Sequence, residues 1–439
     1  MNTTVLRKVG ASDASANMEA KTYAKVVRRI IPLLFLCYIL SYLDRVNVGF
    51  AKLQMMNDLQ FSETIYGIGA GVFFIGYFLF EVPSNLILHR VGARRWIARI
   101  MITWGLISAS MMFVTSPTMF YVLRFMLGVA EAGFFPGIIL YLTYWFPSER
   151  RGHIIALFMA GVPVAGVIGG PVSGMILETM AGKYGFAGWQ WLFVLEGLPS
   201  ALMGLVVLSY LNDGIEDAKW LTPAEKKLLS DKIIVEESAK GHGSLGTVFK
   251  NSKFWVLCVI YFSVIMGLYG VGFWLPTIIK AMGVESTTTV GFIYAIPYLT
   301  AAIGMILIGK SADRLKERRW HLAIPCFLGA LGLATSVVLS DNPVLAVTAL
   351  SVATLGIVSA MPLFWNFPTM LLTGVAAAGG IAFINSFANI AGFVSPYMMG
   401  LIKDATSSTG AGMYVLALFM VLAGGLTLLA FPAGFGKRA

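Results

Sequence analysis

The sequence is short of charge. Asp, Glu, Lys and Arg make up 12% of its 439 residues, 57% of the residues are hydrophobic, and the mean hydropathy is +0.78. An ordinary soluble domain carries about 25% charged residues, so this composition excludes one. We expect most side chains to face lipid or other buried helices.

Residues that build metal sites and disulfide frameworks are also scarce. The three cysteines, Cys37, Cys258 and Cys326, lie in apolar segments without Cys-x-x-Cys or Cys/His spacing, and the four histidines lie at segment ends or in loops. This pattern favours neither a structural metal nor disulfides, and no nucleophile–base pair falls within an apolar segment. We therefore expect no cofactor, no metal site and no catalytic residue, and predict that the protein is not an enzyme.

Long apolar runs are what the sequence has in abundance. Stretches of roughly 20 residues, the length at which a helix crosses a ~30 Å hydrocarbon layer, recur about twelve times. We predict an all-α membrane protein with 12 transmembrane helices in two pseudo-symmetric six-helix bundles. The expected spans are residues 28–50, 65–89, 95–115, 118–146, 152–178 and 189–211, then 254–280, 288–310, 321–340, 343–366, 374–402 and 411–432.

A polar stretch, Asn212–Lys253, separates the sixth span from the seventh. Within it Thr222 can cap a short helix that begins at Pro223, because Glu225 occupies the third position of a capping box. The predicted organisation is a cytoplasmic N-terminal tail (1–27), a first bundle (28–211), a cytoplasmic linker (212–253), a second bundle (254–432) and a cytoplasmic C-terminal tail (433–439).

The positions of the positive charges predict the topology. Of the 32 Lys and Arg residues, 26 lie in the tails, the linker and alternate loops, whereas the opposite side has Lys52, Lys183, Lys280 and Lys403. This distribution follows the positive-inside rule, so the net charge of +10 does not indicate a nucleic-acid partner. We expect a multi-pass, monomeric protein of a bacterial cytoplasmic (inner) membrane, in contact with lipid, with both termini in the cytoplasm.

Five ionisable residues stand out inside the predicted spans, where an ionised side chain at the centre of a helix costs ~2.5–3.5 kcal/mol on insertion scales. They are Asp44 and Arg45 in the first span, Arg124 and Glu131 in the fourth, and Glu196 in the sixth. We interpret the first four as functional, with a structural clamp inside the first half as the alternative. For Glu196 we favour packing or gate hydrogen bonding.

Helical geometry gives these charges directions. At about 100° per residue, Tyr38 and Tyr42 share a stripe with Arg45, whereas Asp44 points away from it. We therefore predict that Arg45, Tyr42 and Tyr38 bind the substrate and that Asp44 faces another neighbour.

The fourth span holds its two charges too far apart to pair, since Arg124 and Glu131 are separated by roughly 10 Å along the helix axis. We predict that Asp44 pairs with Arg124 instead, with Gly128 leaving room for an incoming group. Two arginines and two carboxylates are formally neutral, so a bound carboxylate leaves the site negative and protonation of Glu131 or Asp44 restores the balance. The sequence therefore predicts symport of a small organic anion with protons.

Polar and aromatic residues of other spans complete the predicted cavity. Tyr77 and Glu81 share one face of span 2, with Tyr77 a candidate substrate ligand and Glu81 a candidate gate residue. Asn389 in span 11 is the predicted ligand from the second half, and Tyr269 and Trp365 are further candidates. Interhelical hydrogen bonding, core packing and interfacial anchoring are the alternatives for these residues. The glycine-rich span 7 and the segment around Trp365 in span 10 are expected to bend.

An internal repeat relates the two halves. The arginines after span 2 recur 224 residues later after span 8, where the run from Gly309 to Arg319 resembles the signature loop Gly-x-x-x-Asp-Arg-x-x-x-Arg-Arg of the major facilitator superfamily. That resemblance implies two parallel six-helix halves with a site between them. We predict gate roles for Asp313, Arg314, Arg90 and Arg94.

Three further runs are similar to the anion:cation symporter branch of that superfamily: Tyr42-Leu-Asp-Arg-Val-Asn-Val-Gly-Phe-Ala, Phe80-Glu-Val-Pro-Ser-Asn and Arg124-Phe-Met-Leu-Gly-Val-Ala-Glu-Ala. The resemblance implies uptake of organic anions such as sugar acids, tartrate, phthalate or nicotinate. It also implies carboxylate binding by Arg45 and Tyr77, proton uptake by Asp44 and Glu131, and coupling by Arg124. Sugar-acid carriers have a polar residue where this chain has Val162, which favours a less hydroxylated, aromatic carboxylate.

Other functions are compatible with parts of the sequence. A proton-coupled exporter is favoured by the glycine-rich run Gly166–Gly174 in span 5, which nearly matches an antiporter signature of the superfamily, although close helix packing explains these glycines equally well. The intramembrane arginines disfavour an exporter of cationic drugs. A nutrient sensor and a membrane enzyme are less favoured still, since the chain has no signalling domain and no catalytic cluster.

Overall fold

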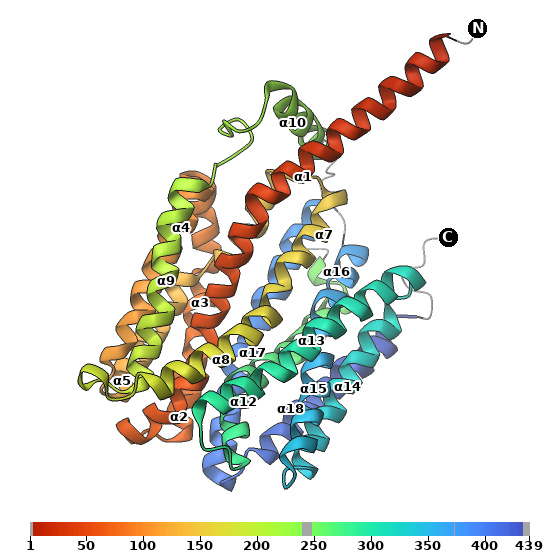
Figure 1. The fold of residues 1–439 in the computed structure, drawn as a ribbon. Coiled ribbons are helices and arrows are strands. Elements are labelled where there is room, and N and C mark those ends of the chain that lie inside the picture. Colours follow the sequence, from red (N-terminus) through yellow and green to blue (C-terminus); the bar gives the residue numbers. More distant parts are fainter. Residues whose placement is uncertain (1–2, 239–247, 373, 433–439) are drawn as a thin grey trace.

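The computed structural model describes residues 3–238, 248–372 and 374–432, nearly all of them helical (Figure 1). Within these described ranges, eleven helices or joined helix pairs are long and apolar enough to cross a membrane. A further helix, α17 (Gly374–Thr406), has 33 residues and packs in the same assembly. The predicted all-α fold with two six-helix bundles is confirmed. The predicted tail 433–439 and residues 239–247 of the predicted linker lie outside the described residues.

Nine helices form the six spans of the first bundle. Residues 3–27, the described part of the predicted cytoplasmic tail, are helical and continuous with the first span. The helices are α1 (Thr3–Val46), α2 (Val48–Leu59), α3 (Glu63–Val91), α4 (Ala93–Ser110), α5 (Pro117–Glu131), α6 (Phe134–Thr143), α7 (Ser148–Met159), α8 (Gly161–Thr179) and α9 (Gly188–Tyr210), with short 3-10 helices at Met111–Phe113 and Lys183–Gly185.

The second bundle contains seven helices in six spans. Besides α17 they are α12 (Ser252–Ala281), α13 (Thr287–Leu315), α14 (Arg319–Val338), α15 (Pro343–Phe364), α16 (Asn366–Leu371) and α18 (Gly410–Ala430).

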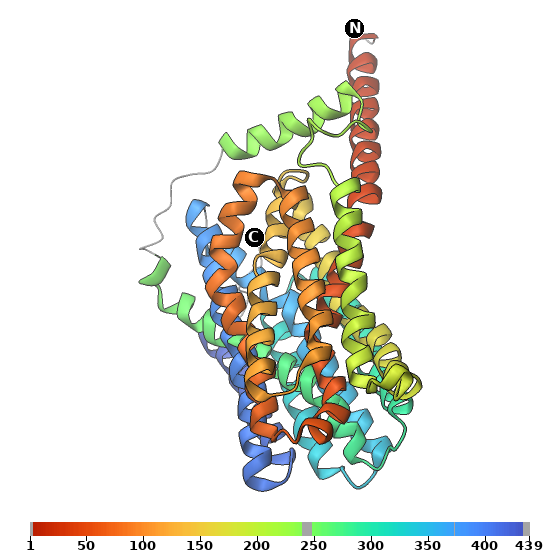
Figure 2. The ribbon, with the colours of Figure 1, turned by 90° about the vertical axis from the view of Figure 1, so that its left-hand side faces the viewer.

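Between the bundles lies α10 (Pro223–Ser238), which begins with the predicted capping box. The Glu225 backbone N–H donates to Thr222 Oγ1 over 3.3 Å, and the Thr222 N–H donates back to Glu225 Oε2 over 2.8 Å. The Thr222 N–H and Lys25 of α1 lower the pKa of Glu225. We call the end of the molecule where α1 protrudes beside α10 the linker end, and the opposite end the far end (Figures 1 and 2).

The interruptions within spans differ from those predicted. The fourth span breaks directly after Glu131, where Ala132 is extended and Gly133 has a φ of 85°, a left-handed backbone that favours glycine. Span 10 is interrupted at Trp365, as predicted. In span 7, for which we predict a bend, α12 is continuous, and glycines such as Gly270 seat the neighbouring Leu416 side chain.

The two bundles meet along three helix pairs, most extensively α3 with α17 and α8 with α13, and also α2 with α12. A Cβ atom at Gly170 would lie 2.6 Å from the carbonyl oxygen of Gly291, and one at Gly174 would overlap the carbonyl oxygen of Thr287. The glycine-rich run of span 5 therefore allows close contact between the bundles. This contact accounts for the resemblance to an antiporter motif without requiring export.

Candidate functional site

The centre of the first bundle holds an ion pair between Arg45 and Glu131. Arg45 lies in the last turn of α1, and its Nη2 contacts Oε1 of Glu131, the last residue of α5. Ser41 Oγ also donates to Glu131 Oε1, over 2.7 Å. From the second bundle, the Tyr269 hydroxyl accepts a bond of 2.9 Å from Arg45 Nη1. Arg45 thus joins one carboxylate of its own bundle to one hydroxyl of the other.

Aromatic side chains surround this guanidinium. The rings of Phe73, Phe74 and Tyr77 on α3 lie 5.3, 6.0 and 5.4 Å from its central carbon. Tyr42, 2% exposed, has its hydroxyl close to that of Tyr298 of the second bundle, near the Gly272 backbone. The structure therefore brings Arg45, Tyr42, Tyr77 and Tyr269 together, as the sequence predicted for substrate ligands.

Tyr38 lies one turn further toward the linker end and packs on Phe158 with ring centroids 4.3 Å apart. Tyr38 thus extends the group of aromatic side chains around Arg45 toward the linker end.

The predicted pairing of Asp44 with Arg124 is wrong for this conformation. Asp44 accepts hydrogen bonds from Trp104 Nε1 (2.9 Å), Ser108 Oγ (2.8 Å) and Ser200 Oγ (2.5 Å), because its direction on α1 faces α4 and α9. Arg124 instead donates to backbone carbonyl oxygens of α3, those of Gly69 and Ala70, each over 3.1 Å.

Gly128 does not leave room for a ligand either. A Cβ there would overlap the Phe73 carbonyl oxygen, so Gly128 serves the close approach of α5 to α3.

Several polar atoms at this centre have no hydrogen-bond partner among the described residues. They are Nε of Arg45, Nη1 of Arg124, Oε2 of Glu131 and the hydroxyl of Tyr42, all buried. Unpaired polar atoms in a membrane interior are costly. Spare N–H donors, a spare carboxylate oxygen and a hydroxyl together suit a small polar ligand that carries an anionic group.

Glu81 and Asn389 form a second polar group between the bundles. Glu81, 4% exposed, accepts bonds from Asn385 Nδ2 (3.2 Å) and Ser386 Oγ (2.9 Å) of α17, and Asn389 lies beside it. Glu81 thus bridges the bundles, as a gate residue would. The observed neighbour of Asn389, the predicted second-half ligand, is Glu81.

Trp365 is half-buried, and its ring packs edge-on against Tyr261 with centroids 4.8 Å apart. This position favours the packing alternative over the predicted substrate contact.

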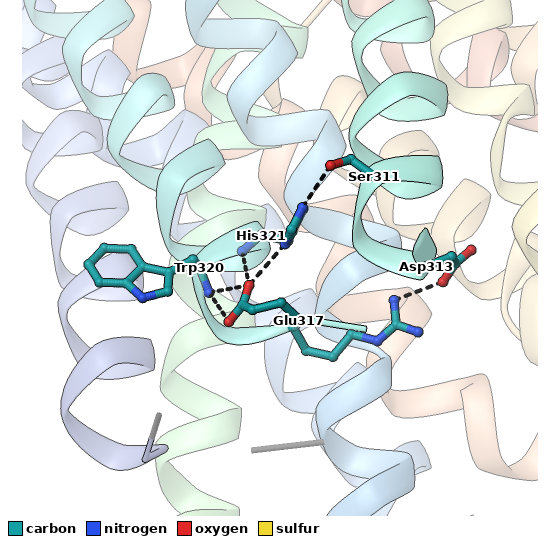
Figure 3. A network of polar contacts seen from close by, with 6 residues as sticks. Ser311, Asp313, Glu317, Trp320 and His321 are labelled. Atoms are coloured by element: carbon teal, nitrogen blue, oxygen red, sulfur yellow. Dashed lines mark hydrogen bonds and ion pairs between the residues drawn. The ribbon is translucent and has the colours of Figure 1, made fainter. Parts of the chain in front are cut away.

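The predicted gate residues at the linker end make contacts within their own half. Asp313, 76% exposed, pairs with Arg318 over 2.8 Å (Figure 3). Arg94 donates its backbone N–H to Asp213 over 2.8 Å, and Arg90 and Arg314 are exposed. Among the described residues, none of these four side chains bridges the bundles in this conformation.

The same loop carries a compact polar network at the start of α14. Glu317 accepts bonds from the Trp320 N–H (2.9 Å) and from Nδ1 of His321 (2.9 Å), and the other ring nitrogen of His321 faces Ser311 Oγ (Figure 3). Burial opposes ionisation of Glu317, but these donors outweigh it and lower the pKa of that carboxyl.

Sequence reasoning missed a polar cluster that joins the bundles at the far end. Glu63 contacts Lys52 (2.6 Å) and Lys403 of α17 (2.5 Å), and the Thr64 N–H donates to Asp404 over 2.8 Å. The Lys52 ammonium lies 3.4 Å from the ring centroid of Trp274 in α12. The signal was available, since Lys52 and Lys403 are two of the four lysines on a side otherwise free of positive charge outside the spans.

Known proteins share this sequence over most of its length. Residues 34–396 match the Major Facilitator Superfamily. The chain belongs to this superfamily. Membership makes it a secondary transporter of the membrane rather than an enzyme.

Relatives in this superfamily are named after different substrates. A Pseudomonas putida protein, named a metabolite transport protein NicT, is 50% identical over 419 residues, 95% of this chain and 95% of that protein. An Agrobacterium vitis protein, named a tartrate transporter, is 48% identical, and the match covers 94% of this chain and 92% of that protein. An Acinetobacter baumannii quinolone resistance transporter is 41% identical, and the match covers 94% of this chain and 96% of that protein.

Among solved superfamily structures, a D-xylose-proton symporter matches with a TM-score of 0.74 at 15% identity, over 94% of this chain and 100% of that one. At this identity the likeness shows the fold.

Proposed function

We propose that this transporter takes up a small organic carboxylate together with protons across the bacterial cytoplasmic membrane. The observation that carries the proposal is the buried Arg45–Glu131 pair at the centre of the first bundle. Arg45 keeps one N–H free, and Arg124 keeps another. The relative named a tartrate transporter supports a carboxylate cargo.

Exchange of partners at Arg45 is the proposed coupling step. A substrate carboxylate and Glu131 compete for the same guanidinium, because both are anionic and Arg45 is the cation in contact with Glu131. Protonation of Glu131 removes its charge and frees Arg45 for the substrate. By linkage, substrate binding then favours the protonated form of Glu131. Asp44, held by three donors on the other side of α1, is the second proposed proton site.

The predicted topology places the linker end in the cytoplasm. The far-end cluster of Glu63, Lys403 and Asp404 would then close the periplasmic side in this conformation, while Asp313 and Arg314 remain exposed on the cytoplasmic side. Rocking of one bundle against the other would break the contacts of the far-end cluster and bring Asp313 and Arg314 into contact with the other bundle.

A proton-coupled exporter is the second candidate, and the Acinetobacter baumannii relative favours it. Two buried arginines at the centre suit an anionic or zwitterionic compound and disfavour a purely cationic one.

Uptake by proteoliposomes tests the proposal. Purified protein would be reconstituted and supplied with labelled L-tartrate, nicotinate, phthalate and a sugar acid, with and without an inward proton gradient. We expect at least one acid to accumulate against its gradient, and only when the external pH is lower. Accumulation of none, with export of a quinolone from preloaded vesicles, would favour the alternative.

A further inference from the structure

Glu196 is a buried carboxyl that the proposed exchange at Arg45 does not use. It lies on α9, eight residues and so about 12 Å from the far end of that helix, and is 5% exposed. Ser173 Oγ of α8 donates to its Oε1 over 2.6 Å. Its other oxygen, Oε2, is buried without a hydrogen-bond partner.

The neighbours of Glu196 offer no positive charge. Asn47, between α1 and α2, faces this carboxyl, and Tyr294 of α13 approaches from the second bundle. The other ionisable group nearby is Asp44, which is itself acidic. Among the described residues no Lys, Arg or His forms an ion pair with Glu196.

Both polar atoms of the Asn47 side chain lack a partner, although Asn47 is 1% exposed. The Tyr294 hydroxyl is also buried without a partner. The Asn47 side chain, whose amide nitrogen and oxygen are both unpaired, therefore lies beside the carboxyl whose Oε2 is unpaired.

Asp44 and Glu196 differ in how well their carboxyl oxygens are hydrogen-bonded. They are close enough to compare, because Ser200, one turn after Glu196 on the same face of α9, donates a hydrogen bond to Asp44. Asp44 has three donors on its two oxygens, which suits an ionised carboxylate that can only accept. Glu196 has one donor, and an ionised carboxylate left so poorly paired inside a membrane is strongly disfavoured. A protonated carboxyl, by contrast, has an O–H of its own to donate.

We propose that Glu196 carries a proton in this conformation and that Glu196, Ser173 and Asn47 form a proton-binding site separate from the Arg45–Glu131 pair. One proton on Oε2 supplies a donor to the Asn47 carbonyl oxygen and so satisfies both unpaired atoms. The proposal rests on the proposed function in one respect: protons are taken to be the coupling ion.

Packing between the bundles explains how this proton would be exchanged only once per cycle. Ser173 belongs to α8, which packs directly on α13, the helix of Tyr294. While α8 and α13 are in contact at the far end, the Glu196 site is enclosed. Separation of these helices, which opening of the far end requires, would expose it to water on that side. The proton would therefore enter from the side opposite the linker end.

Infrared spectroscopy of the full-length protein in lipid, without added substrate, tests the protonation. We expect the carbonyl-stretching band of a buried protonated carboxyl at pH 7, lost in Glu196→Gln and retained in Glu225→Gln, which alters a partly exposed carboxyl on α10, outside the membrane spans. Ser173→Ala would move the band to higher wavenumber, because the carbonyl loses its hydrogen bond. An unchanged spectrum in both Glu196→Gln and Ser173→Ala overturns the proposal. So does a band that disappears when sodium chloride replaces choline chloride, because the site would then bind sodium.

Proton counting tests the role in transport. With whichever of the four acids named above the vesicles accumulate, the reversal potential gives the number of protons moved per anion, and we expect Glu196→Gln to lower that number by one. An unchanged number overturns the role in coupling. If none of the four acids is accumulated, the proposed function fails, and the infrared bands still decide whether Glu196 holds a proton.

Discussion

The two halves of the chain differ in what they bury. All seven buried charged side chains of the described residues lie in the first half, whereas the buried polar side chains of the second half are serines and threonines. The seven are Asp44, Arg45, Lys52, Glu81, Arg124, Glu131 and Glu196. Separating a buried ion pair costs several kcal/mol. By keeping such pairs within one rigid body, the protein can move its second half without breaking them.

The largest effect should come from Arg45, whose removal would leave Glu131 without a cation. Truncating one partner of a buried, hydrogen-bonded charge pair costs about 2–5 kcal/mol, or roughly 30-fold to several thousand-fold in affinity. We expect Arg45→Gln to lose binding of the accumulated acid by at least that lower figure, measured by isothermal titration calorimetry. Arg28→Gln, which alters an exposed arginine on the linker-end part of the same helix α1, is the matched control. Equal affinities in the two variants would show that Arg45 is structural.

Glu131→Gln should separate binding from coupling. The amide cannot take up a proton, and Arg45 has no competing carboxylate, so binding should persist while its dependence on pH disappears. In vesicles we expect exchange of labelled for unlabelled acid to continue and accumulation driven by a pH gradient to fall at least tenfold. Accumulation at the wild-type level would contradict the proposed exchange of partners.

The contribution of the second half is tested by Tyr269→Phe, which removes its one hydrogen bond to Arg45. A hydrogen bond to a charged group is worth about 1.5–3 kcal/mol, so we expect about a tenfold rise in Kd or more, with pH coupling intact. Tyr414→Phe, on an exposed ring of α18, is the control. Loss of pH coupling in Tyr269→Phe would break the division of labour between the halves.

The smallest effect concerns Lys403, whose pairing with Glu63 is partly exposed. Exposed ion pairs contribute about 0.2–1 kcal/mol, so Lys403→Met should raise the population with an open far end by a factor of roughly 1.4 to 5. Spin labels at Asn57 and Ser408, exposed positions in different halves, would report this population by pulsed electron paramagnetic resonance. Lys183→Met, which alters a far-end lysine outside the cluster, should leave the distance distribution unchanged.

The sequence was sufficient for the fold, because span length, loop charge and the linker are each properties of short segments. Helical periodicity put Tyr42 with Arg45 on one face of span 1 and Tyr77 on a polar face of span 2, and Tyr269 was a further candidate from span 7. Sequence reasoning did not identify the hydrogen-bond partners of Asp44 and Arg124. Periodicity gives a direction but not the neighbour in that direction, and here the neighbours were hydroxyls, an indole and backbone carbonyls.

Two other misses have the same origin. The role of Gly128 depends on how closely α3 approaches, and the far-end cluster depends on residues more than 300 positions apart, such as Glu63 and Lys403. Neither is a property of one segment. The rarity of lysine on that side was the available signal, and it marks a position without naming its partner.

The break at Gly133 has a consequence for the electric field at Glu131. Because α5 ends at Glu131, the negative pole of the α5 dipole, equivalent to roughly half an elementary charge, lies at this carboxylate. Arg45 therefore offsets two sources of negative potential, the carboxylate and the helix end. A substrate that draws the guanidinium away must therefore overcome the attraction of both the carboxylate and the helix end. A fixed backbone feature thus adds to the hold on Arg45 that a substrate anion has to break.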